Sequence, residues 1–354
     1  KTEEVAHAEG GDVSNAAALC LCYFLSFPSP SPSTPRRRPS PAPLQAAPPP
    51  ACHLPSWEGP HMAAGVEGEA PPPPHPLCAS LTDPELKALL TGTDVCADFE
   101  AVCAKLGLRP PPRVATALRA MAEQLAQTRS FAMKRWACDA ATLCALLVSL
   151  STHRVGTVKF CGCAIAPAEL LLLKLGLPPS VSTLLVDGAE PSDTPTRFAP
   201  LLALPPSVCV LSLKSCCIGG AELEQLLPLL AANPALTALS LWGNPLGDGG
   251  ARAIAASLGS LRALNLGNTL LGSRGAQALG RAIGANTSLT SLNLSHNRVG
   301  RALGEAMLQG LAVNNTLCLL DLRRNALPEE TQALLREEAS RSDSGRVKPL
   351  EIGL

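Results

Sequence analysis

The sequence predicts an α/β solenoid, a horseshoe of stacked repeats with a parallel sheet on the concave side and helices on the convex side. Apolar residues make up 46% of the 354-residue chain but aromatic residues only 3%, so the core must be built from Leu, Ala and Val. A leucine frame recurs through the second half of the chain, and segments of helical period separate its copies. This combination favours a thin, repetitive architecture over one large globular core.

The recurring frame is LxxLxLxxN/CxL. Its clearest copy, LTALSLWGNPL, begins at Leu236, and close matches begin at Leu289 and Leu317. The starts at residues 155, 181, 208, 236, 261, 289 and 317 are separated by 26, 27, 28, 25, 28 and 28 residues. A period this regular predicts about seven repeats between residues 155 and 339.

The frame has a physical explanation. Apolar side chains at its fourth and sixth positions point inward from a short strand, and Asn or Cys at the ninth position bonds backbone groups where the strand turns away. Period-3.6 segments then predict returning helices at residues 221–232, 249–258, 275–283 and 302–313, and a last helix at 328–336. One unit cannot bury its own apolar face, so the units must stack.

Unit lengths near 28 with a full helix resemble the ribonuclease-inhibitor-like class of leucine-rich repeats. The resemblance covers residues 155–339, over half of the chain. The class includes ribonuclease inhibitor, the receptor tails of the NLR family, the GTPase-activating protein of Ran, tropomodulin-like actin regulators and several ciliary proteins. The resemblance therefore implies a fold and a binding role, and it does not identify a partner.

The region ahead of the repeats, residues 80–154, has helical period. Thr82 or Asp83 can cap a first helix whose first turn accommodates Pro84. Further helices are predicted at 97–106, 113–129 and about 137–151. Because the end of a solenoid exposes its apolar core, we interpret this block as a cap, with an independent helical interaction domain as the alternative.

The first 79 residues are rich in Pro, Ser and Ala and predict a disordered tail, because they lack both backbone donors and apolar periodicity. The apolar run at 16–27 is shorter than a membrane span requires and lacks the flanks of a signal peptide. Met62 is followed by Ala-Ala-Gly-Val-Glu-Gly-Glu, and we hypothesise that the natural product starts there, without residues 1–61. Residues 340–354 are expected to form a polar tail.

Charge and motifs argue against several classes of function. Lys plus Arg equals Asp plus Glu at 29 each, so the composition indicates neither nucleic acid nor an anionic membrane as partner. The fourteen cysteines are mostly scattered singly through apolar segments without zinc-ligand spacing, which indicates buried thiols in a reducing compartment. The sequence contains no GxxxxGK[ST], GxSxG or HExxH motif, so we expect no enzyme, catalytic residue, cofactor or metal site.

Partner-binding residues are expected at the third, fifth and seventh frame positions, whose side chains point outward from the concave face. They are also expected at the eighth position, which lies at the rim of that face. Trp242 stands out because neighbouring repeats have small side chains on this face and exposed aromatic residues are common interaction hot spots. The alternative role for Trp242 is packing against the rim. His296, Asp321, Arg323 and Arg324 form a polar cluster that suits a polar or acidic partner, or else a solvated face. The predicted partner-binding residues are Lys159, Asp187, Lys214, Trp242, Asn265, Asn293, His296, Asp321, Arg323 and Arg324.

The sequence therefore predicts a cytoplasmic, monomeric scaffold that binds a protein partner through its concave face. The alternatives are a regulator of an enzyme, either a GTPase activator or an inhibitor, and a structural component of the cytoskeleton or a cilium. The acidic C-terminal tract typical of the Ran activator is missing, which weakens the GTPase-activator interpretation.

Overall fold

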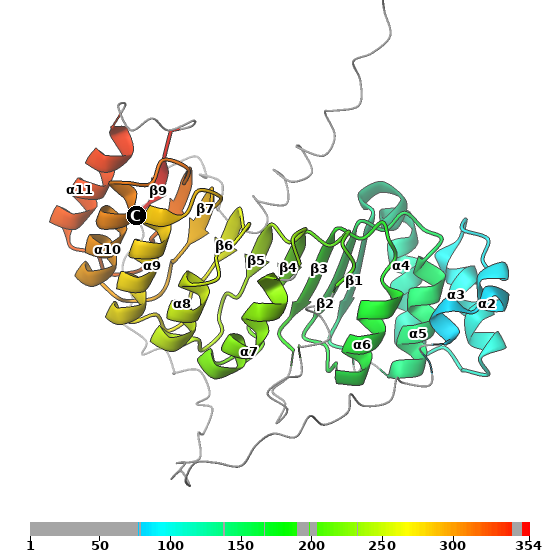
Figure 1. Cartoon of the computed structure of the whole chain (residues 1–354). Coiled ribbons are helices and arrows are strands. Elements are labelled where there is room, and N and C mark those ends of the chain that lie inside the picture. Colours follow the sequence, from blue (N-terminus) through cyan, green and yellow to red (C-terminus); the bar gives the residue numbers. More distant parts are fainter. Residues whose placement is uncertain are drawn as a thin grey trace, which may run out of the picture. The chain divides into compact units, whose positions relative to one another are not determined.

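The computed structural model describes residues 77, 79–136, 139–165, 167–189, 198, 204–231, 233–341 and 349–354. The chain divides into two units, and all of these residues belong to the one that contains residues 75–354. They form an open sheet of nine parallel strands whose spatial order is their chain order (Figure 1). The predicted tail, residues 1–79, lies outside the described residues except for 77 and 79.

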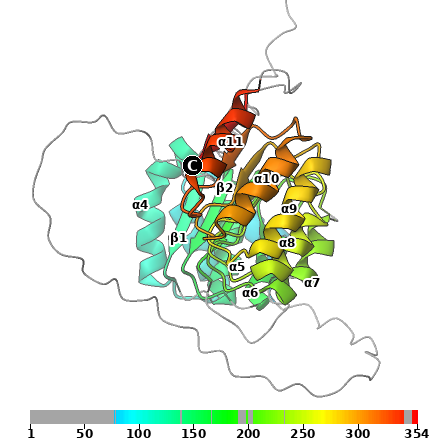
Figure 2. The same cartoon turned by 90° about the vertical axis from the view of Figure 1, so that its left-hand side faces the viewer.

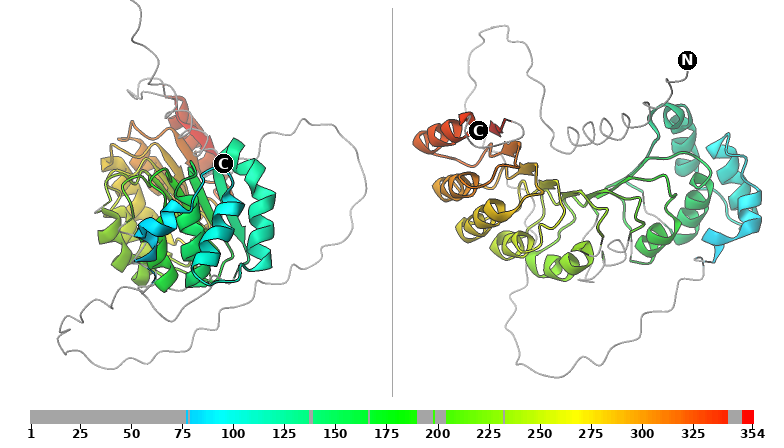
Figure 3. Two further views of the ribbon diagram at one scale, coloured as in Figure 1. Left: turned by 90° about the vertical axis from the view of Figure 1, so that its right-hand side faces the viewer. Right: turned by 45° about the horizontal axis from the view of Figure 1, so that its top comes forward.

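The strands are short and similar in length. They are β1 (Ser130–Lys134), β2 (Thr157–Cys161), β3 (Thr183–Asp187), β4 (Val210–Ser212), β5 (Ala238–Ser240), β6 (Ala263–Asn265), β7 (Ser291–Asn293), β8 (Leu319–Asp321) and β9 (Glu351–Gly353). The sheet curves, and the helices that follow its strands lie along its outer side (Figure 3, right). Parallel strands joined by helical crossovers on one face are the arrangement that the repeat frame predicts.

Helices connect successive strands of the stack. They are α5 (Ala140–Leu150), α6 (Pro167–Gly176), α7 (Gly220–Ala231), α8 (Gly247–Ala255), α9 (Ser273–Ala285), α10 (Arg301–Leu311) and α11 (Glu329–Ser340). Figure 2, which views the stack from its C-terminal side, shows α7 to α11 as one layer on the same side of the sheet. The last five helices therefore cover the outer face from β4 to β9.

The core lies between the sheet and these helices. Residues at the fourth frame position pair across the whole sheet, for example Leu239 with Leu264 and Leu264 with Leu292. Each of these three leucines is at most 1% exposed, and the sixth-position Leu241 is equally buried. The inward orientation predicted for these two positions is confirmed.

Asparagine side chains at the ninth frame position form a ladder of hydrogen bonds between adjacent repeats, just after each strand ends. Asn297 Oδ1 accepts hydrogen bonds from the backbone N–H of Thr269 (2.9 Å) and Leu271 (3.2 Å) in the preceding repeat, and its Nδ2 donates to the carbonyls of Leu266 and Leu294 (both 2.9 Å). Asn244 makes the same four bonds between its repeat and the preceding one. The predicted role of the ninth position is confirmed, and the bonds join adjacent repeats as well as shaping each turn.

In some repeats the ninth frame position holds Cys or Thr in place of Asn. The Sγ atom of Cys216 lies 3.0 Å from the Val186 carbonyl, and Cys163 Sγ lies 3.6 Å from the Met133 carbonyl. Thr269 donates its hydroxyl to the Leu266 carbonyl at 2.7 Å. A thiol or hydroxyl has fewer hydrogen-bonding groups than an amide, so these repeats are joined by fewer side-chain bonds.

The sheet extends beyond the predicted repeats at both ends, which corrects the expected boundaries at residues 155 and 340. Strand β1 lies inside the expected helical cap and pairs with β2, aligning Phe131 with Val158 and Met133 with Phe160. Strand β9 lies in the expected polar tail and pairs with β8, aligning Ile352 with Leu320. Both segments contain apolar residues at alternating positions that fill the same layer of the core.

Ahead of β1, the chain forms the predicted helices with slightly shifted ends. They are a 3₁₀ turn η2 (Ser80–Thr82), α2 (Pro84–Ala88), α3 (Val95–Lys105) and α4 (Pro112–Thr128). Asp83 caps α2 by accepting from the Glu85 N–H at 2.8 Å, and Pro84 occupies the first turn as expected. Leu86, Phe99, Val102 and Leu118 are buried with the residues of the first repeats.

Candidate functional site

The face of the sheet opposite the helices carries rows of aligned side chains. The strand register places fifth-position residues side by side from β2 to β9: Lys159, Leu185, Ser212, Ser240, Asn265, Asn293, Asp321 and Gly353. Four of the predicted partner-binding residues belong to this row. The other six occupy the seventh or eighth position, at or just beyond the strand ends.

Most of the fifth-position row is buried. Asn265 is 3% exposed, Asn293 4% and Asp321 2%, whereas the predicted interface required these side chains to be accessible. Neighbouring strands lie about 4.8 Å apart, so each short side chain is flanked closely on both sides. These three residues shape the floor of the face and offer little surface to a partner.

Two carboxylates of the predicted set are held within the sheet. Asp187 Oδ1 accepts from the Ser212 hydroxyl and, at 3.0 Å, from the Lys214 N–H. Asp321 accepts from Arg323 Nε at 2.9 Å and from its terminal amino group at 2.7 Å. The hydrogen bond to Asp321 raises the pKa of Arg323 above its ordinary value, and this pair largely neutralises its own charge.

Trp242 lies across the neighbouring repeat. A Cβ atom built on Gly267, the equivalent seventh position of the next repeat, would lie 2.5 Å from the indole Cδ1 of Trp242. Beyond Gly267 the indole reaches the imidazole of His296, with ring centroids 6.5 Å apart in an edge-on arrangement of 76°. The glycine therefore makes room for a Trp242–His296 pair that spans three repeats.

The Trp242–His296 contact shows the packing alternative considered for Trp242, and its role in partner binding stays a prediction. The indole packs against the rim, yet the residue remains half-buried and His296 is exposed. The indole N–H donates no hydrogen bond to any residue that the structure describes. A large ring with an unused donor at a strand end is a common feature of interaction hot spots.

Beyond the strands, the chain leaves the sheet along what we call the exit rim, defined as the eighth and tenth frame positions of the β5 to β8 repeats. Its residues are Gly243, Pro245, Asn268, Leu270, His296, Arg298, Arg324 and Ala326. All except Pro245 have a positive φ, from 53° to 73°. The predicted set included only His296 and Arg324, because tenth positions were not considered as surface.

Two concave hydroxyls lack partners. Ser240 Oγ and Ser291 Oγ are buried and form no hydrogen bond within the described part of the chain. An unpaired buried hydroxyl is unfavourable. The two serines are polar groups that a partner or bound water can satisfy.

Comparison with protein families supports the repeat assignment. Residues 232–255 and 285–301 match the family model described as Leucine Rich repeat. These segments contain strands β5 and β7 with the turns that follow them. The chain is a leucine-rich-repeat protein. Its helix-containing units of 25 to 28 residues are of the ribonuclease-inhibitor-like type.

Solved structures of similar fold include two leucine-rich-repeat examples. The leucine-rich repeat-containing protein LegL7 from Legionella pneumophila is 21% identical, with a TM-score of 0.45, over 59% of this chain and 71% of that one. The structure titled Leiomodin-1 Actin-Binding Site 2 is 24% identical, with a TM-score of 0.37, over 43% of this chain and 90% of that one. A search of curated proteins found no match.

The described residues of this leucine-rich-repeat protein offer no metal, disulfide or membrane-spanning feature. They contain no group of three or more His, Cys, Asp or Glu side chains that could hold a metal ion. No disulfide joins two of the cysteines that the structure describes. No helix among them is long and apolar enough to cross a membrane.

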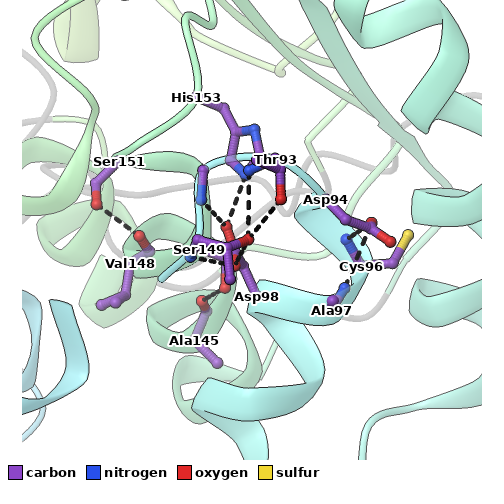
Figure 4. Close-up of polar contacts among 12 residues, drawn as sticks. Thr93, Asp94, Cys96, Ala97, Asp98, Ala145, Val148, Ser149, Ser151 and His153 are labelled. Atoms are coloured by element: carbon purple, nitrogen blue, oxygen red, sulfur yellow. Dashed lines mark hydrogen bonds and ion pairs between the residues drawn. The ribbon is translucent and has the colours of Figure 1, made fainter. Parts of the chain in front are cut away.

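A buried polar cluster joins the N-terminal helices to the first repeats (Figure 4). Asp98 of α3 is 1% exposed and accepts from the N–H and hydroxyl of Thr91, at 2.7 and 2.8 Å. Its second oxygen accepts from the Gly92 N–H and lies beside His153 Nε2, both at 3.0 Å. Because His153 lies between α5 and β2, this cluster fixes the cap against the repeats.

The environment of Asp98 favours its charged form. Burial acts to raise its pKa, but the hydrogen bonds from Thr91, Gly92 and His153 outweigh burial and hold the pKa below its ordinary 3.8. A carboxylate with a lowered pKa stabilises the fold above the ordinary pKa, and its contribution is lost as pH falls through the folded-state value. The cluster is therefore a structural anchor that is weakened by acid.

We expect Asp98→Asn to lower the free energy of unfolding by about 2 kcal/mol at neutral pH, since an amide nitrogen would face groups that need an acceptor. The difference from the unmodified protein should shrink as pH falls below 3.8. Urea denaturation followed by circular dichroism at several pH values measures both effects. Asp94→Asn is the matched control, because Asn can replace Asp94 as the cap of α3. Equal losses in the two variants would contradict the anchoring role.

Proposed function

We propose that this protein is a non-catalytic scaffold that binds a protein partner through the concave side of its leucine-rich repeats. The observation that carries the proposal is the Trp242–His296 pair, a half-buried indole with an unused donor beside an exposed imidazole. It borders a floor of small residues, including Val210, Ala238 and Ala263, that a partner can approach closely. Stacked repeats of this class present rows of side chains to macromolecules, because stacking aligns equivalent positions.

The proposed setting is a reducing one, in the cytoplasm or in a cytoskeletal or ciliary assembly, with the protein as a monomer. The absence of disulfides among the described cysteines supports a reducing compartment. The equal numbers of acidic and basic residues support a protein partner over nucleic acid or a membrane surface.

Trp242→Ala is expected to weaken partner binding by about 2 kcal/mol, or roughly 30-fold in Kd, because hot-spot aromatics of this kind dominate interfaces. The full chain and the variant are used to recover partners from native tissue, and Kd is then measured with the purified partner. Val313→Ala is the control, since Val313 is 73% exposed directly after α10 on the helical side.

Two outcomes oppose the proposal. Unchanged Kd values for both Trp242→Ala and His296→Ala would exclude this end of the concave face as the binding site. A recovered GTPase or hydrolase whose turnover changes when the chain is added would indicate the alternative, a regulator of an enzyme. Circular dichroism of each variant shows whether a weaker affinity reflects loss of folding.

A further inference from the structure

The exit rim carries large side chains at backbone positions that favour glycine. Leu270, His296, Arg298 and Arg324 have φ values of 58°, 64°, 56° and 60°. A left-handed conformation costs about 1 kcal/mol or more for a residue with a Cβ atom, and Gly162, Gly188 and Gly243 occupy the eighth position of other repeats. Folding alone therefore does not explain these four large side chains.

The exit loops stay in register after the strands end, which places these side chains next to one another. The Asn268 N–H donates to the Ser295 carbonyl and the His296 N–H to the Arg323 carbonyl, both at 2.9 Å. Further along, the Gly300 N–H donates to the Asn325 carbonyl at 2.7 Å. Equivalent positions in adjacent loops therefore lie about 4.8 Å apart, so that Leu270 is next to Arg298.

The exit rim is apolar at one end and basic at the other. Pro245 is exposed, and Leu270 is 67% exposed although it is a large apolar residue. The following loops carry the exposed His296, Arg298 and Arg324.

The basic end is not neutralised within the described residues, where neither Arg298 nor Arg324 forms an ion pair. Asp321, on the strand that precedes Arg324, is 2% exposed and bound to Arg323. Arginines without an acidic partner, such as these two on the exit rim, are complementary to carboxylates.

We propose that the exit rim binds an acidic segment of a partner protein, whose carboxylates pair with Arg298 and Arg324 and whose apolar side chain packs on Pro245 and Leu270. The inference rests on the proposed function and specifies its partner class. Arg suits this role because its planar guanidinium binds a carboxylate through two parallel hydrogen bonds. The Trp242–His296 pair borders the same loops and extends the contact toward the concave floor.

The test uses a phage-displayed library of random peptides selected on the immobilised full chain. We expect enriched peptides to be acidic and to contain an apolar residue, with the double reversal Arg298→Glu, Arg324→Glu lowering their affinity at least ~10-fold. The matched control is Arg274→Glu, Arg281→Glu, which changes net charge equally on exposed positions of α9 and should alter affinity less than ~2-fold. Leu270→Ala should weaken binding ~5-fold and Val313→Ala should not.

Several outcomes would overturn the inference. They are the absence of enriched peptides, enrichment of neutral or basic ones, equal binding by the two double variants, and rim-dependent binding of a single-stranded oligonucleotide. Failure here is distinguishable from failure of the scaffold function. If a captured partner depends on Trp242 but not on Arg298 and Arg324, the scaffold stands and the acidic partner class falls; if it depends on neither, both fall.

Discussion

Asn297→Ala is expected to lower the free energy of unfolding by about 4 kcal/mol. The buried N–H groups of Thr269 and Leu271 lose their acceptor, and the carbonyls of Leu266 and Leu294 each lose one of two side-chain donors. Each buried group left without a hydrogen bond costs about 1 to 3 kcal/mol, and partial relaxation offsets some of the total. Because a domain is stabilised by only about 5 to 15 kcal/mol, the repeats around β6 and β7 should open.

Urea denaturation followed by circular dichroism measures the loss, and hydrogen exchange shows where it occurs. Protection should fall first in β6 and β7, because each repeat contacts mainly its neighbours. Asn297→Thr should recover part of the stability, since Thr269 shows that a hydroxyl at this position bonds the strand carbonyl.

Asn268→Gly is the control for Asn297→Ala. Asn268 is exposed, and glycine tolerates its φ of 53°. A loss below about 1 kcal/mol for Asn297→Ala would show that the ladder is dispensable, contrary to the expectation for buried unpaired groups.

The frame itself predicts the repeats because a strand of alternating leucines followed by Asn has only one way to bury its apolar side. It could not reveal the first strand, since Thr128 stands where the frame has leucine and Trp136 where it has Asn or Cys. Strand β9 was missed for a similar reason. Its copy starts at Pro349, and only Ile352 and Leu354 keep the frame.

The candidate site was predictable only in part. Sequence spacing places Trp242 on the concave face and His296 at its rim, but their contact depends on the missing side chain of Gly267 in the repeat between them. Accessibility was not predictable for Asn265, Asn293 and Asp321, because burial depends on how closely neighbouring strands approach. Their burial leaves little surface for a partner, and their role in binding stays a prediction.

The tenth-position residues were missed because neither Leu nor Arg is typical of a left-handed backbone. Position within the frame is the signal that finds them, since the turn on both sides of the ninth-position Asn repeats from loop to loop. Cys217, Leu270, Arg298 and Ala326 are all tenth positions, and all have a φ between 54° and 58°.

Gly280→Ala is expected to destabilise the protein by about 2 kcal/mol, although alanine favours helices. A Cβ atom at Gly280 in α9 would lie 2.3 Å from the carbonyl oxygen of Ala306 in α10, and one at Gly310 would lie 2.5 Å from the carbonyl oxygen of Gly280. The contact is between backbones, so no side-chain rotation can relieve it. The helices must separate, which loosens the packing beneath β7 and β8.

Gly249→Ala is the matched control, because the same chemical change in α8 meets no atom within 4 Å. There the helix propensity of alanine should raise the free energy of unfolding by about 0.5 to 1 kcal/mol. The two variants should therefore shift the urea midpoint in opposite directions. Gly280→Val, which adds two methyl groups at the same contact, should lose more than Gly280→Ala. Stabilisation by both alanine variants would mean that α9 and α10 can separate at little cost and that the stack does not depend on this glycine contact.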